Sequence, residues 1–171
     1  KKSFFQKSYE TYKIFGICFF LYYFIKYIYS KIFCKSVKKI LLERNIKIIK
    51  LNGEINSADN VMIIKNDNPD LLISILGNQI FKKQIFDLAP KGCLNLHTAL
   101  LPKYRGLIPS FWVLKNNEKK TGVSVFIVDK GIDSGPILVQ KEIEIGNMTQ
   151  AELIRKTKLL GMIAIIEAIQ L

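Results

Sequence analysis

The sequence predicts an α/β fold in which a mainly parallel sheet carries helices on both faces. Short apolar runs bounded by turn residues alternate along the chain with stretches of helical periodicity. The runs are as short and as uniformly apolar as buried parallel strands usually are. No internal repeat or low-complexity linker interrupts the pattern. These observations together predict a single structural domain of alternating strands and helices.

Length and composition fit a folded domain. The chain has 171 residues, of which 49% are hydrophobic, so it is long enough and apolar enough to bury a core. It opens on Lys1 without a signal-peptide pattern and stops inside an expected helix. We therefore expect it to be a fragment of a longer protein.

The positive charge is concentrated at the amino-terminal end. The net charge is +12, and residues 1–50 hold 12 basic and 2 acidic side chains. A basic surface attracts tRNA, sugar nucleotides or anionic lipid through long-range electrostatics. A solvated lysine-rich face is the alternative interpretation, and the charge alone does not decide between them.

The cysteines favour a reducing environment. There are three of them, with no Cys-x-x-Cys pair and no histidine at ligand spacing. Neither a disulfide framework nor a zinc site is expected from this pattern. We therefore expect a cytoplasmic protein.

The first element is expected to be helical. Ile14–Ile25 is an uninterrupted apolar run of 12 residues between Lys13 and Lys26. A membrane-spanning helix needs about 20 such residues, so a span is not expected. We expect residues 1–45 to form a basic, aromatic-rich helical segment packed on a domain of residues 46–171. A helix lying on a membrane surface, in peripheral contact, is the second interpretation.

The remaining elements follow from periodicity and turn signals. Pro90-Lys-Gly92 introduces one strand, and Thr149 with Glu152 forms a capping box that opens the last helix. In chain order, the expected elements are a helix at Val37–Arg44, strands at Ile46–Leu51 and Leu71–Leu76, a helix at Ile80–Leu88, a strand at Cys93–His97, a helix at Ser110–Leu114, strands at Gly122–Val128 and Ile137–Ile145, and the carboxyl-terminal helix.

Two polar residues stand out in the strand that ends at His97, which is the only histidine of the chain. Side chains repeat every second residue in a strand, so Asn95 and His97 share one face. The strand ends there, because Pro102 cannot continue a central ladder. Ligands of open α/β sheets bind at the carboxyl ends of strands. An amide and an imidazole at such an edge can stabilise a developing oxyanion and move a proton.

The loop Asp129–Pro136 supplies a carboxylate. Gly131 and Gly135 allow a tight turn on either side of Asp133. A carboxylate beside His97 would orient the imidazole and its proton. A solvated turn aspartate is the alternative, since Asp-Ser-Gly is common in turns.

Three ordered motifs carry a family resemblance. Asn95-Leu-His97-Thr-Ala-Leu-Leu-Pro102-Lys-Tyr-Arg-Gly106 is followed by Thr121-Gly122-Val123, and then by Gly131-Ile-Asp133-Ser-Gly135. In this order they resemble the folate-dependent formyltransferases, which act on glycinamide ribonucleotide, methionyl-tRNA or amino sugars. The resemblance runs from about Pro69 to the end of the chain. It implies a Rossmann-like α/β fold, and the family's first strand is not visible in this sequence.

The resemblance also implies roles for single residues. Asn95, His97 and Asp133 fall on the family's catalytic triad. Ile75–Ile80 and the loop from Asp129 fall where the family binds the pteridine of 10-formyltetrahydrofolate, largely through backbone groups. The expected folate-binding residues are Leu76, Gly77, Asn78, Ile80, Leu100, Asp129 and Gly131. Arg105 and Tyr104 are expected to bind the acceptor, and no metal is implied. One departure is Ala99, where the family commonly has serine.

The implied reaction is formyl transfer from 10-formyltetrahydrofolate to a primary amine, carried by methionyl-tRNA or an amino-sugar nucleotide. The Leu-Leu-Pro-Lys-Tyr-Arg-Gly run resembles these branches more than the purine branch. Two alternatives stay open. One is a formyltetrahydrofolate deformylase, which uses water as the acceptor. The other is a non-catalytic folate-binding or membrane-peripheral relic. The expected partners are the folate and the amine acceptor.

Overall fold

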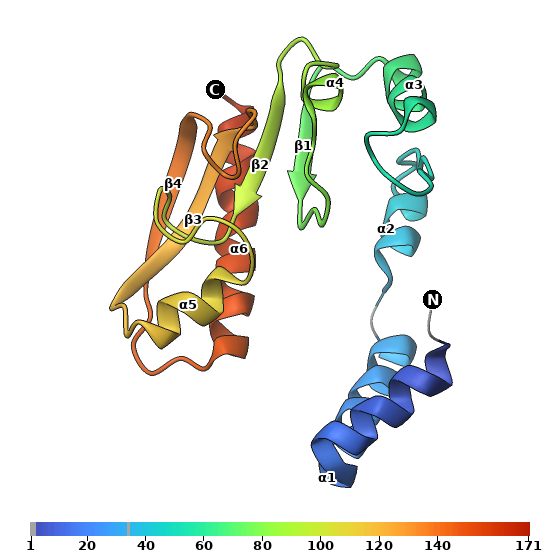
Figure 1. Cartoon of the computed structure of the whole chain (residues 1–171), viewed down its shortest axis with the longest axis vertical. Helices are drawn as coiled ribbons and strands as arrows, with labels where there is room; N and C mark the ends of the chain where they lie inside the picture. Colours follow the sequence, from blue (N-terminus) through green and yellow to red (C-terminus); the bar gives the residue numbers. More distant parts are fainter. Residues whose placement is uncertain (1–2, 34) are drawn as a thin grey trace. The chain divides into compact units, whose positions relative to one another are not determined.

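A computed structural model describes residues 3–33 and 35–171 of the chain (Figure 1). The chain divides into two compact units, residues 1–50 and residues 51–171. Each unit is described by itself below.

The first unit is built around a broken helix. α1 (Phe4–Phe33) contains a non-helical residue, Gly16, with φ 78° and ψ 174°. Only glycine adopts this backbone conformation without strain. The break divides α1 into two arms, and the rings of Tyr12 and Phe20 meet edge to face across it, 6.3 Å apart. The expected amino-terminal helix is therefore present, but it is bent into two arms.

A short helix and an irregular segment complete this unit. α2 (Val37–Glu43) begins after Ser36, whose side chain accepts a hydrogen bond from the backbone of Lys39. The prediction of a strand at Ile46–Leu51 is wrong, because these residues are irregular in the structure. Alternating Ile and Lys residues favour a strand only where a neighbouring strand can pair with them. The sheet of this structure pairs four other segments.

One stretch of this unit has the length and composition of a membrane span. It runs from Tyr12 to Glu43 and has a mean hydropathy of 1.3 in its most apolar window. The break at Gly16 and the helix start after Ser36 divide this stretch into shorter helices. The stretch has the length and composition of a span, but in this structure it is not one continuous helix.

The second unit contains a four-stranded sheet in the order β1-β2-β3-β4 (Figure 1). Its strands are β1 (Leu72–Ile75), β2 (Cys93–His97), β3 (Lys120–Ile127) and β4 (Ile137–Glu144). β1 and β2 are parallel, whereas β2 with β3 and β3 with β4 are antiparallel. The α/β class is confirmed. The sheet is mixed and not mainly parallel, because β3 returns directly into β4 without a crossover helix.

Four helices accompany the sheet. They are α3 (Ala58–Asp67), α4 (Lys83–Phe86), α5 (Pro109–Lys115) and α6 (Gln150–Ile169). The sequence interpretation missed α3, although Ser57 caps it by accepting from the backbone of Asn60. The helix expected at Ile80–Leu88 is confined to one turn, α4. The capping box of Thr149 and Glu152 is confirmed, with both reciprocal hydrogen bonds present.

The core lies between α6 and one face of the sheet. Leu94, Val123 and Val125 from β2 and β3 pack against Ala164 and Ile165 of α6. Side chains alternate between the two faces along a strand, so Asn95 and His97 of β2 belong to the other face. Ile73 and Ile75 of β1 pair with Leu94 and Leu96, so they lie on the α6 face, although both side chains are exposed. Within the described residues, α6 is the only helix that packs extensively on the sheet.

The burial of Cys93 at the start of β2 leads to a first prediction, on the reactivity of its thiol. The side chain is 1% exposed, and burial raises the pKa of its thiol to about 11. Since the thiolate is the reactive form, alkylation of Cys93 at pH 8 should be roughly two orders of magnitude slower than that of an ordinary thiol. Cys18 is exposed and provides the internal control. Iodoacetamide labelling followed by peptide mass spectrometry measures both rates. Equal labelling of the two cysteines in the folded protein would contradict the burial.

Candidate active site

The segment that follows β2 is fixed by a hydrogen-bond network from β3 and β4. The Ser124 hydroxyl donates to the carbonyl oxygen of Ala99 at 2.7 Å and accepts from the backbone of Leu101 at 3.0 Å. Gln140 donates to both the Leu101 carbonyl and the Ser124 hydroxyl. Ser124 and Ala99 are fully buried. The chain therefore leaves β2 along one defined path, through a cis peptide bond between Leu101 and Pro102.

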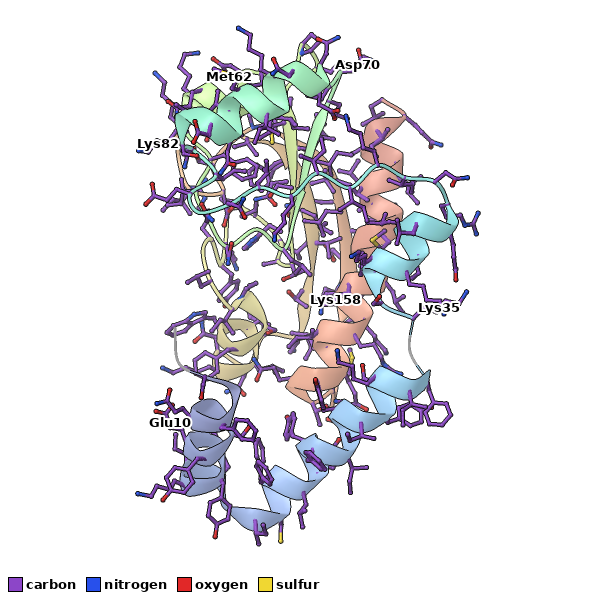
Figure 2. The ribbon with its side chains drawn as sticks, turned by 90° about the vertical axis from the view of Figure 1, so that its right-hand side faces the viewer. Glu10, Lys35, Met62, Asp70, Lys82 and Lys158 are labelled. Atoms are coloured by element: carbon purple, nitrogen blue, oxygen red, sulfur yellow. The ribbon has the colours of Figure 1, made fainter. Side chains whose placement is uncertain are left out.

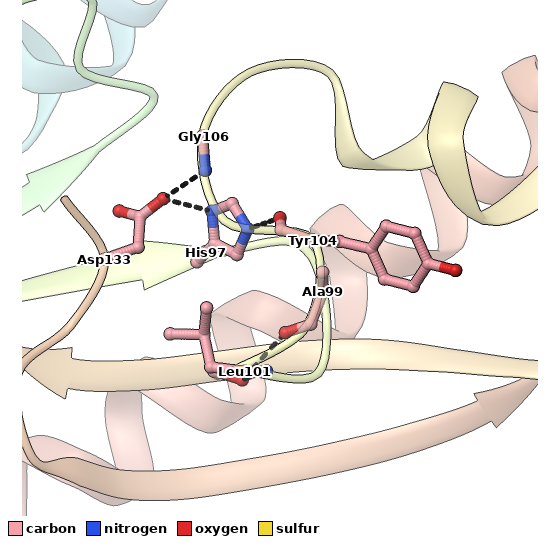
Figure 3. A network of polar contacts seen from close by, with 7 residues as sticks. His97, Ala99, Leu101, Tyr104, Gly106 and Asp133 are labelled. Atoms are coloured by element: carbon pink, nitrogen blue, oxygen red, sulfur yellow. Dashed lines mark hydrogen bonds and ion pairs between the residues drawn. The ribbon is translucent and has the colours of Figure 1, made fainter.

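His97 ends β2 and is 8% exposed. Its Nε2 lies 2.7 Å from the carbonyl oxygen of Tyr104 (Figure 3). A carbonyl oxygen can only accept, so Nε2 must carry the proton of this hydrogen bond. The other ring nitrogen, Nδ1, lies 3.4 Å from Oδ2 of Asp133. The ring is thus pinned on one side and faces a carboxylate on the other.

Asp133 is held by the same loop that holds His97. The backbone N–H of Gly106 donates to Asp133 Oδ2 at 2.8 Å, and Figure 3 shows both contacts converging on this oxygen. Asp133 itself has φ 48°, an unusual value for a residue with a side chain. A Cβ at Gly135 would overlap the carbonyl oxygen of Ile127. A bare glycine there lets the loop lie close enough to β3 for Asp133 to reach His97.

Asn95 lies two residues before His97 on the same face of β2 and is partly buried. Within the described part of the chain, its side-chain amide has no hydrogen-bond partner. The structure brings His97 and Asp133 into contact and leaves the Asn95 amide available on the same strand.

Tyr104 anchors the loop from a distance. Its hydroxyl donates to Oε1 of Glu118 at 2.6 Å and accepts from Nδ2 of Asn116 at 3.1 Å. The bond to Glu118 raises the pKa of the Tyr104 phenol. The contact is therefore intact at neutral pH and is lost only as the pH rises through that raised value. The sequence analysis missed Glu118 and Asn116, because polar loop residues that bind another side chain cannot be told from solvated ones by composition.

The loop Leu76–Ile80 after β1 is exposed and is tied to the segment before α3. Gln79 accepts from the backbone of Ile55 at 2.7 Å, and Asn56 donates to the carbonyl oxygen of Ile80 at 2.8 Å. Leu76 has φ 57° and is 69% exposed. Gly77 and Asn78 are exposed as well, so the loop presents backbone groups to solvent.

Asp129 begins the loop after β3 and lines a cavity of about 450 Å³ with Phe86, Cys93 and Lys130, among others. The Ser134 hydroxyl and then the Gly131 backbone donate to its carboxylate, and they hold its pKa below the ordinary value. Of the residues expected to bind folate, Asp129 is the one that lines this cavity.

Three further expected residues lie around the turn after β2. Leu100 and Tyr104 line a second cavity of about 190 Å³. Arg105 is exposed, and its charge also lowers the pKa of Asp129. The described residues contain no group of three or more His, Cys, Asp and Glu side chains that would hold a metal ion.

This geometry defines a class of protein: an α/β domain with an amide and an imidazole on one strand, β2, and a carboxylate from the loop after β3 beside the imidazole. Comparison with known proteins identifies the class more closely. Residues 37–169 match the model of the formyl transferase family, which covers most of the chain. The chain belongs to this family.

Curated relatives agree with this assignment. The chain is 42% identical over 136 residues to a methionyl-tRNA formyltransferase of Thermodesulfovibrio yellowstonii, covering 78% of this chain and 44% of the relative. It is 38% identical over 118 residues to that of Kosmotoga olearia, covering 69% and 38%. The chain thus spans less than half the length of these relatives.

Solved structures share the fold. A phosphoribosylglycinamide formyltransferase from Anaplasma phagocytophilum superposes with a TM-score of 0.70 at 20% identity, over 77% of this chain and 66% of that one. A sugar N-formyltransferase from Shewanella superposes with 0.59 at 25% identity, over 77% and 50%. A formyltetrahydrofolate deformylase from Pseudomonas syringae gives 0.71 at 15% identity, over 78% and 47%. At 15–20% identity the likeness concerns the fold alone.

The anchoring of the loop by Tyr104 makes a second prediction. Tyr104→Phe removes the bond to Glu118 and should loosen the loop, so that the Gly106 amide, which donates to Asp133, exchanges faster with solvent. Tyr29→Phe, at an exposed position of α1, is the matched control. Residue-resolved hydrogen exchange measures the effect. An unchanged Gly106 exchange rate in Tyr104→Phe would show that the tyrosine hydroxyl does not hold the loop.

Proposed function

We propose that the chain carries the catalytic part of an enzyme that transfers a formyl group from 10-formyltetrahydrofolate to a primary amine. The observation that carries the proposal is the setting of His97, between the Tyr104 carbonyl at 2.7 Å and the Asp133 carboxylate at 3.4 Å. An imidazole at the end of a strand that is held beside a carboxylate is suited to proton transfer.

The reaction follows from this arrangement. The amine nitrogen attacks the formyl carbon, and the electron pair of the C=O bond moves to oxygen. The Asn95 amide, which has no partner within the described residues, donates to this oxyanion. The proton released by the amine moves to the His97–Asp133 pair, directly or through water. It is returned to N10 of the folate as the carbon–N10 bond breaks.

The two ring nitrogens of His97 are proposed to have different tasks in this mechanism. Because Nε2 donates to Tyr104, Nδ1 is the nitrogen that exchanges a proton beside Asp133. Its 3.4 Å contact is longer than a charge-assisted hydrogen bond, so it can shorten when substrate binds. When Nδ1 is protonated, the charge of the ring also stabilises the oxyanion.

The folate is proposed to bind along the exposed loops Leu76–Ile80 and Asp129–Asp133. Backbone N–H and C=O groups suit the donor and acceptor edge of a pterin. The cavity of about 450 Å³ beside Asp129 is in the size range of small-molecule sites, and Phe86 and Ile127 give it apolar walls. Leu76, Ile80 and Leu100 supply further apolar surface.

The acceptor is proposed to be a primary amine on methionyl-tRNA or on an amino-sugar nucleotide. Relatives about 40% identical are methionyl-tRNA formyltransferases, which supports the first. Arg105, exposed one residue after Tyr104, is suited to bind a phosphate of either acceptor. We also infer a cytoplasmic location, which agrees with the free thiols of Cys18 and Cys93.

Substitution of His97 tests the reaction. In the protein at its natural length, His97→Ala should lower turnover by about 10²–10⁴-fold, because it removes the proton-transfer group. Asn95→Ala should lower it by about 10²–10³-fold through loss of an oxyanion donor. Asp59→Asn, at an exposed position of α3, is the control. Formyl transfer to each amine and formate release are measured in parallel. Full activity of His97→Ala would remove the residue from the mechanism, and formate release without an amine would point to a deformylase.

Separating binding from chemistry tests the folate assignment. Since backbone groups carry most of the proposed folate contacts, Asp133→Asn should reduce formyl transfer far more than folate affinity. Calorimetric titration with a non-reactive 10-formyltetrahydrofolate analogue measures the affinity of wild type and variant. No binding by folded wild-type protein would overturn the folate assignment and favour a non-catalytic relic.

A further inference from the structure

The first unit concentrates aromatic residues to an unusual degree. Seven of the 11 phenylalanines and six of the seven tyrosines of the chain lie within residues 1–33. Most of the described side chains of α1 are exposed, and the proposed reaction uses none of them. An exposed apolar surface of this extent marks an interaction site.

The second arm of α1, residues 17–33, has two unlike sides. An aliphatic stripe recurs at helical spacing and comprises Ile17, Leu21, Ile25, Ile28 and Ile32. All five side chains are between 41% and 67% exposed. By the same spacing, Lys26 and Ser30 lie on the opposite side, and Tyr22 lies on the flank. Lys26 stands 6.0 Å and 5.9 Å from the rings of Tyr22 and Tyr23, and Lys31 stands 5.7 Å from that of Tyr27.

We propose that this aliphatic stripe docks α1 into the surface of a membrane containing anionic lipid. Charge supports this occupant, because residues 1–50 carry 12 basic and 2 acidic side chains, which complement an anionic headgroup layer. Composition supports it as well, since tyrosine and lysine beside an apolar face are characteristic of membrane–water interfaces.

The geometry favours docking over spanning. The bend at Gly16 separates the two arms, visible at the lower end of the ribbon in Figure 2. From Ile17 to the first lysine, Lys26, there are nine uncharged residues, which reach about 13 Å as a helix. A hydrocarbon core is about 30 Å thick. The arm is therefore suited to lie in one leaflet with its lysines at the headgroups.

Vesicle flotation of the whole chain tests this. The protein should float with phosphatidylcholine vesicles that contain phosphatidylglycerol and remain unbound with phosphatidylcholine alone. Salt at about 0.5 M should weaken the binding, because it shortens the Debye length to about 4 Å and screens the attraction between lysines and headgroups. Ile25→Glu, on the stripe, should weaken flotation by more than about tenfold. Ser30→Glu adds the same charge on the opposite side and should weaken it less. Circular dichroism of both variants checks that helix is retained.

Three results would overturn the proposal. They are absence of flotation with anionic vesicles, equal loss in both glutamate variants, and retention that resists alkaline extraction, which indicates insertion. A lipid-free dimer that Ile25→Glu dissociates, with no vesicle binding, would assign the stripe to a second copy of the chain. Formyl transfer is not part of this test, so the two proposals fail separately.

Discussion

The hydrogen bond between His97 Nε2 and the carbonyl oxygen of Tyr104 is the contact on which the site depends. The acceptor is a backbone carbonyl, so the hydrogen bond does not need the Tyr104 side chain directly. It does need the loop to keep its conformation. Two anchors hold that path. Ser124 and Gln140 fix the chain before the loop, and Glu118 fixes the tyrosine hydroxyl beyond it. The orientation of one imidazole thus rests on groups from β3, β4 and the segment after α5.

The same loop joins two parts of the chain that are distant in sequence. Gly106 donates to Asp133 from 27 positions away, and that carboxylate oxygen also faces His97. The contact needs a tight connection after β3, which the bare Cα of Gly135 permits beside the Ile127 carbonyl. The glycines that the sequence predicted to allow a tight turn are thus also needed for close contacts within the protein. At Gly131, the Ser134 hydroxyl occupies the corresponding space.

The sequence predicted the local elements of the site well, and the long-range ones poorly. Strand periodicity and Pro102 were enough to place Asn95 and His97 on one face at the end of β2. The capping box of α6 is equally local. The strand expected at Ile46–Leu51 failed because pairing depends on a partner that periodicity does not reveal. The mixed sheet was missed for the same reason. Ser124, Glu118 and Gln140 act through tertiary contacts, which no short-range pattern encodes.

The Tyr104 carbonyl sets the tautomer of His97. Because His97 is the only histidine of the chain, its two ring nitrogens are assignable without ambiguity by ¹⁵N NMR. When the ring is neutral, we expect the proton on Nε2 and the lone pair on Nδ1, facing Asp133. A neutral ring protonated on Nδ1, or an equal mixture of the two tautomers, would contradict it.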